Sequence, residues 1–195
     1  MSQTIYTIGH SRRTNEELLG ILHHAGITQL IDVRAYPRSA RHSWFNDTAL
    51  RPTLAQAGVS YRWLGRELGG LRDPHPDSHH LALRLGGLRG FADYMETPEF
   101  FRGIALLAEA TVRIPSVIMC TEATPSECHR GMIADFLTVQ CHRGMIADFL
   151  TVHGIEVIHL LGIGEKQTHR LHPAARNENG RLVYDRTGQR GLALD

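Results

Sequence analysis

The chain has 195 residues, 42% of them hydrophobic, which is enough apolar material for one α/β domain and leaves little room for a second. Its 21 basic and 20 acidic residues argue against bulk attraction to nucleic acid or a membrane, so any anion site must be local. Because three cysteines, an odd number, come with no signal peptide and no apolar run of membrane length, we expect free thiols in the cytoplasm rather than a disulfide framework.

The amino-terminal part of the chain shows a strand, a helix and a second strand. A β-rich run at residues 4–8 leads to His10, an amphipathic helix pattern covers residues 14–26, and an apolar run at residues 27–33 ends beside Arg34. Strand-helix-strand units of this length form right-handed parallel crossovers. We therefore expect the second strand to end next to His10.

The rest of the chain continues the alternation. The expected elements are a helix at 46–57, an edge strand at 59–64, a glycine-rich loop at 64–87, helices at 88–96 and 98–110, and strands at 117–120, 155–160 and, at an edge, 181–184. This order predicts a single α/β domain over residues 1–195, with a mainly parallel open sheet and helices on both faces. Ligands of such sheets bind beyond the carboxyl ends of the strands.

The stretch at residues 117–130 is the central feature, because a strand there turns directly into a helix. Thr124, followed three residues later by Glu127, has the pattern of a capping box, and a proline stands at the favoured first helical position. A helix start at this point places Cys128 where the helix dipole lowers a thiol pKa and attracts anions.

The side chains around this helix start indicate possible chemistry. Cys128 is the candidate nucleophile and Glu122 a candidate proton-transfer group. Arg130 stands early in a helix, where a cation opposes the dipole, so we expect an anionic partner, either Glu122 or a ligand phosphate. Neighbouring helical residues point about 100° apart, so Cys128, His129 and Arg130 are not all expected to face one pocket.

A metal site is not expected from the spacing of the possible ligands. Such a site would combine Cys120, Cys128 and His129 with an outside ligand such as His10 or Glu122. The two cysteines are eight residues apart and lack the paired short spacing of structural zinc motifs.

His10, Ser11 and Asp32 have the composition of a hydrolytic triad, but the chain contains no Gly-x-Ser-x-Gly nucleophile elbow. Asp32 could equally pair with Arg34 or hold the tautomer of His10. The remaining histidines of interest are interpreted as solvated loop residues, namely His79, His80, His169 and His172.

A basic and aromatic patch is expected after the second strand. It consists of Arg12, Arg13, Arg34, Tyr36, Arg38, Arg41, Trp44 and Phe45. These residue types suit phosphate binding and base stacking, and their position at strand ends favours a ligand role, although a solvated surface loop has the same composition.

Residues 128–139 recur letter for letter as residues 141–152. Two identical copies indicate a recent or engineered insertion rather than a repeat protein. In one continuous helix the 13-residue offset would rotate the second apolar stripe by roughly 220°, so only one copy can fill a single groove on the sheet. We expect the first copy to form the site, because capping residues precede it alone, and the spare copy could mediate a homodimer.

Several short motifs occur in order over nearly the whole chain. They are Thr7-Ile-Gly-His-Ser11, Ile31-Asp-Val-Arg34 with Pro37 and Ser39, Phe45, Leu64-Gly65, Gly90-Phe-Ala-Asp-Tyr-Met95, and Cys120-x-Glu122 through Cys128-His-Arg130. Together they resemble the family called domain of unknown function 488. The resemblance implies a shared polar site without naming a substrate, and the insertion of residues 140–152 departs from the family pattern.

We expect an enzyme-like site at the strand ends that acts on a phosphorylated or nucleotide-like ligand. The catalytic candidates are His10, Asp32, Glu122 and Cys128, and the ligand-binding candidates are Ser11, Arg34, Arg38, Cys120, His129 and Arg130. One alternative is a non-catalytic module that binds nucleic acid or another polyanion through the basic loop. The other, by analogy alone, is rhodanese-like sulfur transfer. No particular cofactor is indicated.

Overall fold

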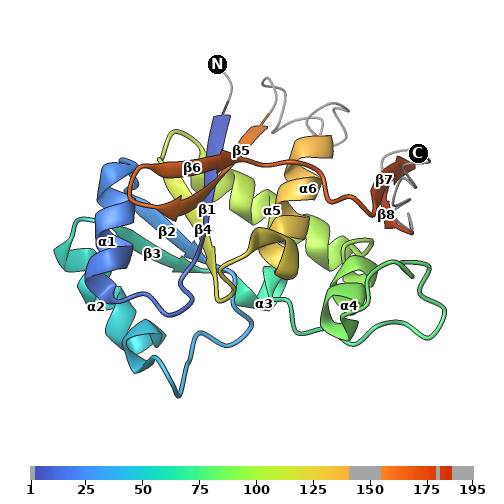
Figure 1. Cartoon of the computed structure of the whole chain (residues 1–195), viewed down its shortest axis with the longest axis horizontal. Helices are drawn as coiled ribbons and strands as arrows, with labels where there is room; N and C mark the ends of the chain where they lie inside the picture. Colours follow the sequence, from blue (N-terminus) through green and yellow to red (C-terminus); the bar gives the residue numbers. More distant parts are fainter. Residues whose placement is uncertain (1–2, 141–154, 179–180, 186–195) are drawn as a thin grey trace, which may run out of the picture.

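The computed structural model describes residues 3–140, 155–178 and 181–185. A sheet lies in the middle of the molecule, and helices pack on both of its faces (Figure 1). The predicted fold class, an α/β domain with a mainly parallel open sheet, is confirmed. Within the described ranges, no helix is both long and apolar enough to cross a membrane.

The main sheet contains six strands in the order β3-β2-β4-β1-β5-β6. Their bounds are Gln3–Gly9 for β1, Gln29–Asp32 for β2, Ser60–Trp63 for β3, Ser116–Cys120 for β4, Ile155–Gly162 for β5 and Glu165–Thr168 for β6. The neighbours from β3 to β5 are parallel, and β6 is antiparallel to β5. The predicted edge position of β3 is confirmed.

The second strand, β2, does not pair with β1, because β4 lies between them. The predicted proximity of its end to His10 is nevertheless observed, since Nη1 of Arg34 lies 3.4 Å from Nε2 of His10. Every residue of β4 is buried. Such a continuous buried run suits a central strand of a parallel sheet, which is covered on both faces. The ends of β1 and β2 still meet, but across the end of β4.

Helices divide between the two faces of the sheet. One face is covered by α1 (Asn15–His24) and α2 (Asp47–Gln56). The other is covered by α4 (Gly86–Tyr94), α5 (Pro98–Thr111) and α6 (His129–Gln140). The short elements η1 (Ser43–Phe45) and α3 (Gly65–Leu68) lie in the connections, and α3 contributes Leu68 to the core beside α5.

The chain leaves neighbouring strands toward opposite faces of the sheet. The connection after β1 leads to α1 on one face, whereas the connection after β4 leads to α6 on the other. In open α/β sheets such a reversal leaves a crevice at the carboxyl ends of the two strands, which is the usual place for a ligand.

The prediction that residues 181–184 form an edge strand of the main sheet is wrong. β8 (Arg181–Tyr184) pairs instead with β7 (Ala175–Glu178) in a separate two-stranded sheet. The hydroxyl group of Tyr184 donates a hydrogen bond of 2.8 Å to Asp135 on α6. This buried contact holds the hairpin against the helical layer rather than the sheet edge.

The first copy of the duplicated segment forms most of α6. Its apolar residues Ile133, Phe136 and Leu137 are buried in the core on that face of the sheet. The second copy, at residues 141–152, lies outside the described residues, and so does the predicted use of this copy in a homodimer.

Candidate functional site

The turn between β4 and α6 differs from the predicted capping box. The side chain of Thr124 makes no capping hydrogen bond, and a 3-10 turn, η2 (Pro125–Glu127), follows it. Cys128 then has an extended backbone, with φ of −136° and ψ of 140°, and α6 begins only at His129. The capping box fails because the α-helix starts too late for Thr124 to reach its first amide groups.

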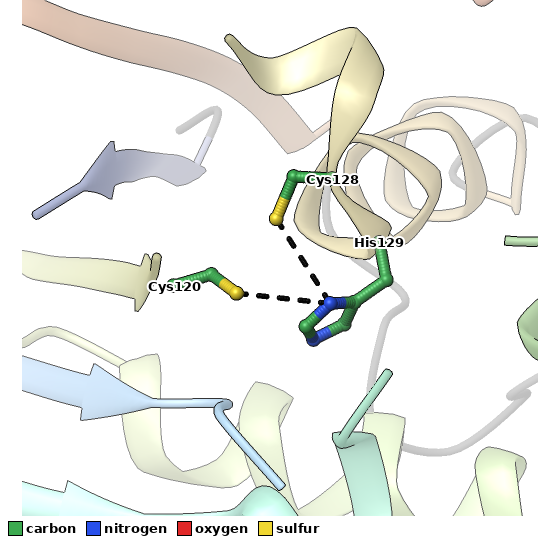
Figure 2. Close-up of side chains that lie close together, drawn as sticks. All are labelled: Cys120, Cys128 and His129. Carbon is green, nitrogen blue, oxygen red and sulfur yellow. Dashed lines mark hydrogen bonds between the residues drawn. The ribbon is translucent and has the colours of Figure 1, made fainter. Parts of the chain in front are cut away.

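Three side chains converge beyond the end of β4 (Figure 2). Nδ1 of His129 lies 3.7 Å from Sγ of Cys120 and 3.9 Å from Sγ of Cys128. All three residues are buried, and both cysteines are free thiols. Because Cys128 precedes the helix, it is not held about 100° away from His129 as two successive helical residues would be.

The orientation of the His129 ring is set by a backbone contact. Its Nε2 lies 3.1 Å from the carbonyl oxygen of Val33, and a carbonyl oxygen can only accept. Nε2 therefore carries a proton, and in the neutral ring the lone pair of Nδ1 faces the two sulfur atoms. The ring also packs edge-on against Phe91, at a centroid distance of 5.0 Å.

The two thiols differ in acidity because they share a hydrogen bond. The bond with Cys120 lowers the pKa of Cys128 well below its usual value, and the nearby His129 lowers this pKa further. The same bond, together with burial, raises the pKa of Cys120 well above its usual value. The negative charge of the pair therefore belongs on Cys128.

This thiol and imidazole cluster borders a cavity of about 480 Å³ beyond the carboxyl ends of β2 and β4. The predicted site residues that line the cavity are Arg34, Arg38, Cys120, Glu122, Cys128 and His129. Tyr36, which is 74% exposed, lies on the same lining. The volume lies in the range of pockets that bind small molecules.

Arg34 is held at this cavity by Asp32. Nε of Arg34 lies 2.9 Å from Oδ1 of Asp32, and its second terminal nitrogen lies 2.6 Å from Oδ2. The same nitrogen donates a hydrogen bond to the carbonyl oxygen of Phe45, and the hydroxyl group of Tyr61 donates one of 2.8 Å to the Asp32 carboxylate. Asp32 is fully buried and is not among the residues that line the cavity. Its contacts indicate that it orients Arg34 instead of meeting a ligand.

His10 lies on the other side of the Arg34 guanidinium. Its Nε2 is 3.4 Å from Nη1 of Arg34, and its Nδ1 is 3.2 Å from the carbonyl oxygen of Ser11. These partners require a proton on Nδ1 and a lone pair on Nε2. Burial, followed by the charge of Arg34, lowers the pKa of His10 to about 4. The ring is therefore neutral at neutral pH, and His10 does not line the cavity.

Ser11 and Arg130 connect loops and are not part of the cavity lining. The backbone amide of Ser11 donates to the carbonyl oxygen of Thr121 at 2.8 Å. Arg130 donates to the carbonyl oxygen of Glu122 and, at 2.7 Å, to that of Ala123. Arg130 therefore meets backbone oxygen atoms in place of the expected carboxylate or phosphate, because its own side chain is buried and needs acceptors for its hydrogen atoms.

The basic and aromatic patch separates into structural and exposed members. Phe45 is buried and stacks on His10 at a centroid distance of 4.3 Å. Arg13 donates to the carbonyl oxygen of Leu161 at 2.6 Å. Tyr36 and Arg38 remain exposed beside the cavity. Only part of the predicted patch is thus available to a ligand.

A buried histidine network was missed by sequence reasoning. Oγ1 of Thr7 lies 2.7 Å from Nδ1 of His159, Nε2 of His159 lies 2.9 Å from Nδ1 of His169, and Nε2 of His169 lies 2.9 Å from the Asp135 carboxylate. The interpretation of His169 as a solvated residue is wrong, because its partners bury it. Polar Thr7 and His159 inside apolar strands were the available signal.

The interpretation of His80 as a solvated residue is also wrong. It is fully buried, and its Nδ1 accepts a hydrogen bond of 3.2 Å from the backbone amide of Tyr184. The neighbouring His79 is exposed, as expected for a loop residue. The hairpin partner of His80 is about a hundred residues away in the chain, which local patterns do not reveal.

Comparison with known proteins adds one match. The family described as Domain of unknown function DUF488 matches residues 14–137, which include the cysteine cluster and both arginines of the cavity. No curated protein and no solved structure matches the chain.

Proposed function

We propose a function from the site itself, because the chain belongs to the family Domain of unknown function DUF488, whose description assigns no activity. The proposed function is that of an enzyme whose active site, at the carboxyl ends of β2 and β4, takes a phosphorylated or nucleotide-like ligand. The observation that carries the proposal is the single cavity that both the arginines and the thiol and imidazole cluster border. Cation and nucleophile can therefore contact one ligand.

The arginines supply the anion-binding part of the proposed site. Arg34 is fixed by its contacts with Asp32, so its remaining Nη1 hydrogen needs little reorganisation to meet a ligand oxygen. Arg38 is exposed on the cavity lining and has the length to reach a phosphate group. Tyr36 offers an aromatic surface beside them for a base or a similar ring.

Cys128 is the proposed nucleophile, because it is the more acidic thiol of the cluster and it lines the cavity. Glu122 is exposed at the same cavity and is the proposed group that exchanges protons with solvent. His10 and Asp32 are proposed as positioning residues, since both contact Arg34 and neither lines the cavity.

The proposal is tested by comparing alkylation with neutral iodoacetamide and anionic iodoacetate. Cys141 falls in a different tryptic peptide from Cys128, and fragment ions distinguish Cys128 from Cys120 within the peptide 114–130, so mass spectrometry gives both rates from one reaction with Cys141 as the internal reference. An adjacent arginine is expected to contribute on the order of 1 kcal/mol, so iodoacetate should be favoured at Cys128 by about fivefold relative to Cys141.

Arg38→Ala should reduce this preference, because only Arg34 then remains at the cavity, whereas Arg41→Ala, on the same loop but outside the cavity lining, should keep it unchanged. Inorganic phosphate and adenosine monophosphate should each slow alkylation of Cys128 and leave Cys141 unchanged. Equal charge preference at the two cysteines, with no protection by phosphate, would reject the proposal.

The two alternatives have weaker support. A polyanion-binding module would use the basic loop, but Arg34 in this loop is already held by buried Asp32. Affinity for nucleic acid that falls with salt and survives Cys128→Ala would favour this alternative. Rhodanese-like transfer needs backbone amides around the sulfur, yet the amide of Cys128 itself donates to Pro125.

A further inference from the structure

We propose that Cys120, Cys128 and His129 form a binding site for one thiophilic divalent ion of the zinc class, with its open coordination position on the cavity. Each residue offers one ligand atom, and the three atoms all lie within 4.8 Å of one another. Figure 2 shows both sulfur atoms and Nδ1 directed toward a common point. Sulfur and imidazole nitrogen are the preferred ligands of Zn²⁺.

The two distances from Nδ1 of His129 to the sulfur atoms fit tetrahedral coordination closely. A zinc ion with bonds of about 2.3 Å to sulfur and about 2.05 Å to nitrogen separates a sulfur and a nitrogen ligand by about 3.6 Å. The observed separations from Nδ1 are 3.7 Å to Cys120 and 3.9 Å to Cys128. Side-chain shifts of a few tenths of an ångström would therefore bring both sulfur–nitrogen separations to the value expected around a zinc ion.

The environment of His129 provides independent support for the ion. The donation from its Nε2 to the carbonyl oxygen of Val33 leaves Nδ1 as the coordinating atom. Metal-binding histidines usually have such a second hydrogen bond, which fixes both tautomer and ring orientation. Packing against Phe91 further restricts the ring. The imidazole is thus already oriented for binding.

Charge and access also fit an ion. Two thiolates would neutralise a divalent cation in this buried place, where an unpaired charge is costly. All three residues line the cavity of about 480 Å³, so a fourth ligand can reach the ion from that side. Two cysteines, one histidine and an open position form a set used by catalytic zinc centres.

A second group of possible ligands, formed by His79, His80 and Glu96, does not fit a metal as well. Nδ1 of His80 accepts a hydrogen bond from the backbone amide of Tyr184, so Nε2 must carry the hydrogen of the neutral ring. That hydrogen blocks the nitrogen atom that would have to bind the ion. The tautomer therefore disfavours this group and favours the cysteine cluster.

The ion site goes beyond the proposed function and does not depend on an anionic substrate. In the loaded protein, Sγ of Cys128 is a ligand rather than a nucleophile, and the ion becomes the group next to the arginines. A bound ion can polarise a phosphoryl oxygen or acidify a water molecule. The arginine part of the cavity has the same role in both forms.

The experiment uses the full chain, stripped with a chelator under reducing conditions and titrated with Co²⁺. We expect one Co²⁺ per chain, with thiolate-to-cobalt charge-transfer absorption and the visible bands of tetrahedral cobalt, both lost when Zn²⁺ is added. Cys120→Ser, Cys128→Ser and His129→Gln should each weaken binding by at least about tenfold. Cys141→Ser is the matched control, since residues 141–152 repeat the same sequence, and it should bind like the parent.

Protection from alkylation provides a measurement that does not depend on variants that may misfold. Zn²⁺ should slow alkylation of Cys120 and Cys128 and leave Cys141 unaffected. Three results would each overturn the ion site. They are a cobalt titration without charge-transfer bands, cobalt binding that Cys128→Ser retains and Cys141→Ser loses, and alkylation of Cys120 and Cys128 that Zn²⁺ does not slow.

The two proposals fail separately. Absence of a cobalt spectrum, combined with phosphate-sensitive alkylation of Cys128, would reject the ion and support the enzyme site. A cobalt spectrum, combined with alkylation of the stripped protein that ignores phosphate and reagent charge, would reject the anion-binding enzyme site and support the ion.

Discussion

Lowering the pH from about 7.5 to about 5 should destabilise the fold, because two buried histidines are neutral in it. Burial and the charge of Arg34 lower the pKa of His10 to about 4. Burial and the nearby His169 lower the pKa of His159 to about 4 as well. In an unfolded chain a histidine titrates near 6.5, so the unfolded state binds more protons between these two values. The stabilisation is complete above about pH 6.5 and is lost as the pH falls toward 4.

The size of the effect follows from the two pKa values. When the pH falls from about 7.5 to about 5, each histidine lowers the free energy of unfolding by about 2 kcal/mol, which corresponds to a slope of about 1 kcal/mol per pH unit. Together His10 and His159 account for about 4 kcal/mol, a large part of the roughly 5–15 kcal/mol by which domains are stable. Burial also lowers the pKa of His80, which acts in the same direction.

Urea denaturation at a series of pH values measures this slope directly. His10→Gln and His159→Gln should each reduce the slope by about 1 kcal/mol per pH unit, because each removes one depressed titration. His23→Gln is the control, since His23 is exposed on α1 and is solvated in both states. A stability that stays constant over this pH range, or a slope that neither buried variant changes, would refute the reasoning.

Three further predictions concern the site and the duplication. Arg34→Lys should lower the free energy of unfolding by about 3 kcal/mol in urea denaturation, because lysine cannot reproduce the forked contact with buried Asp32; a loss below about 1 kcal/mol would contradict this. Gly70→Ala should weaken cobalt binding by about tenfold, because the added Cβ would overlap the His129 ring; unchanged affinity would show that the ring position is unimportant. Deleting residues 140–152 should change stability by less than about 1 kcal/mol, since the first copy already fills the groove, and light scattering before and after deletion tests the homodimer.

The element types were predictable because they depend on neighbours in the chain. Thr14 and Glu17 form the capping pair that starts α1, with the amide of Thr14 donating to the Glu17 carboxylate at 2.8 Å. The apolar run at β4 indicated a buried strand, and every residue of it is buried. The same reasoning failed at Thr124, because a proline-led 3-10 turn competes there with the expected helix start.

The contents of the site were only partly predictable. The sequence indicated that Cys128 and Arg34 follow strand ends, and both line the cavity. It could not indicate that both carboxylate oxygens of Asp32 would accept hydrogen bonds from Arg34, because the distance and angle between two such side chains depend on the backbone between them. It also argued against a metal, since known zinc motifs are recognised by local spacing.

What the sequence determined by itself is the alternation of strands and helices and the presence of a thiol where a central strand gives way to a helix. Hydrophobic periodicity acts over a few residues, so it contains this information locally. Only the tertiary structure decided that β4 lies between β1 and β2, that His129 turns its Nδ1 toward two sulfur atoms, and that Thr7 meets His159. These contacts join groups far apart in the chain, and they depend on the strand order and on the face to which each connection crosses.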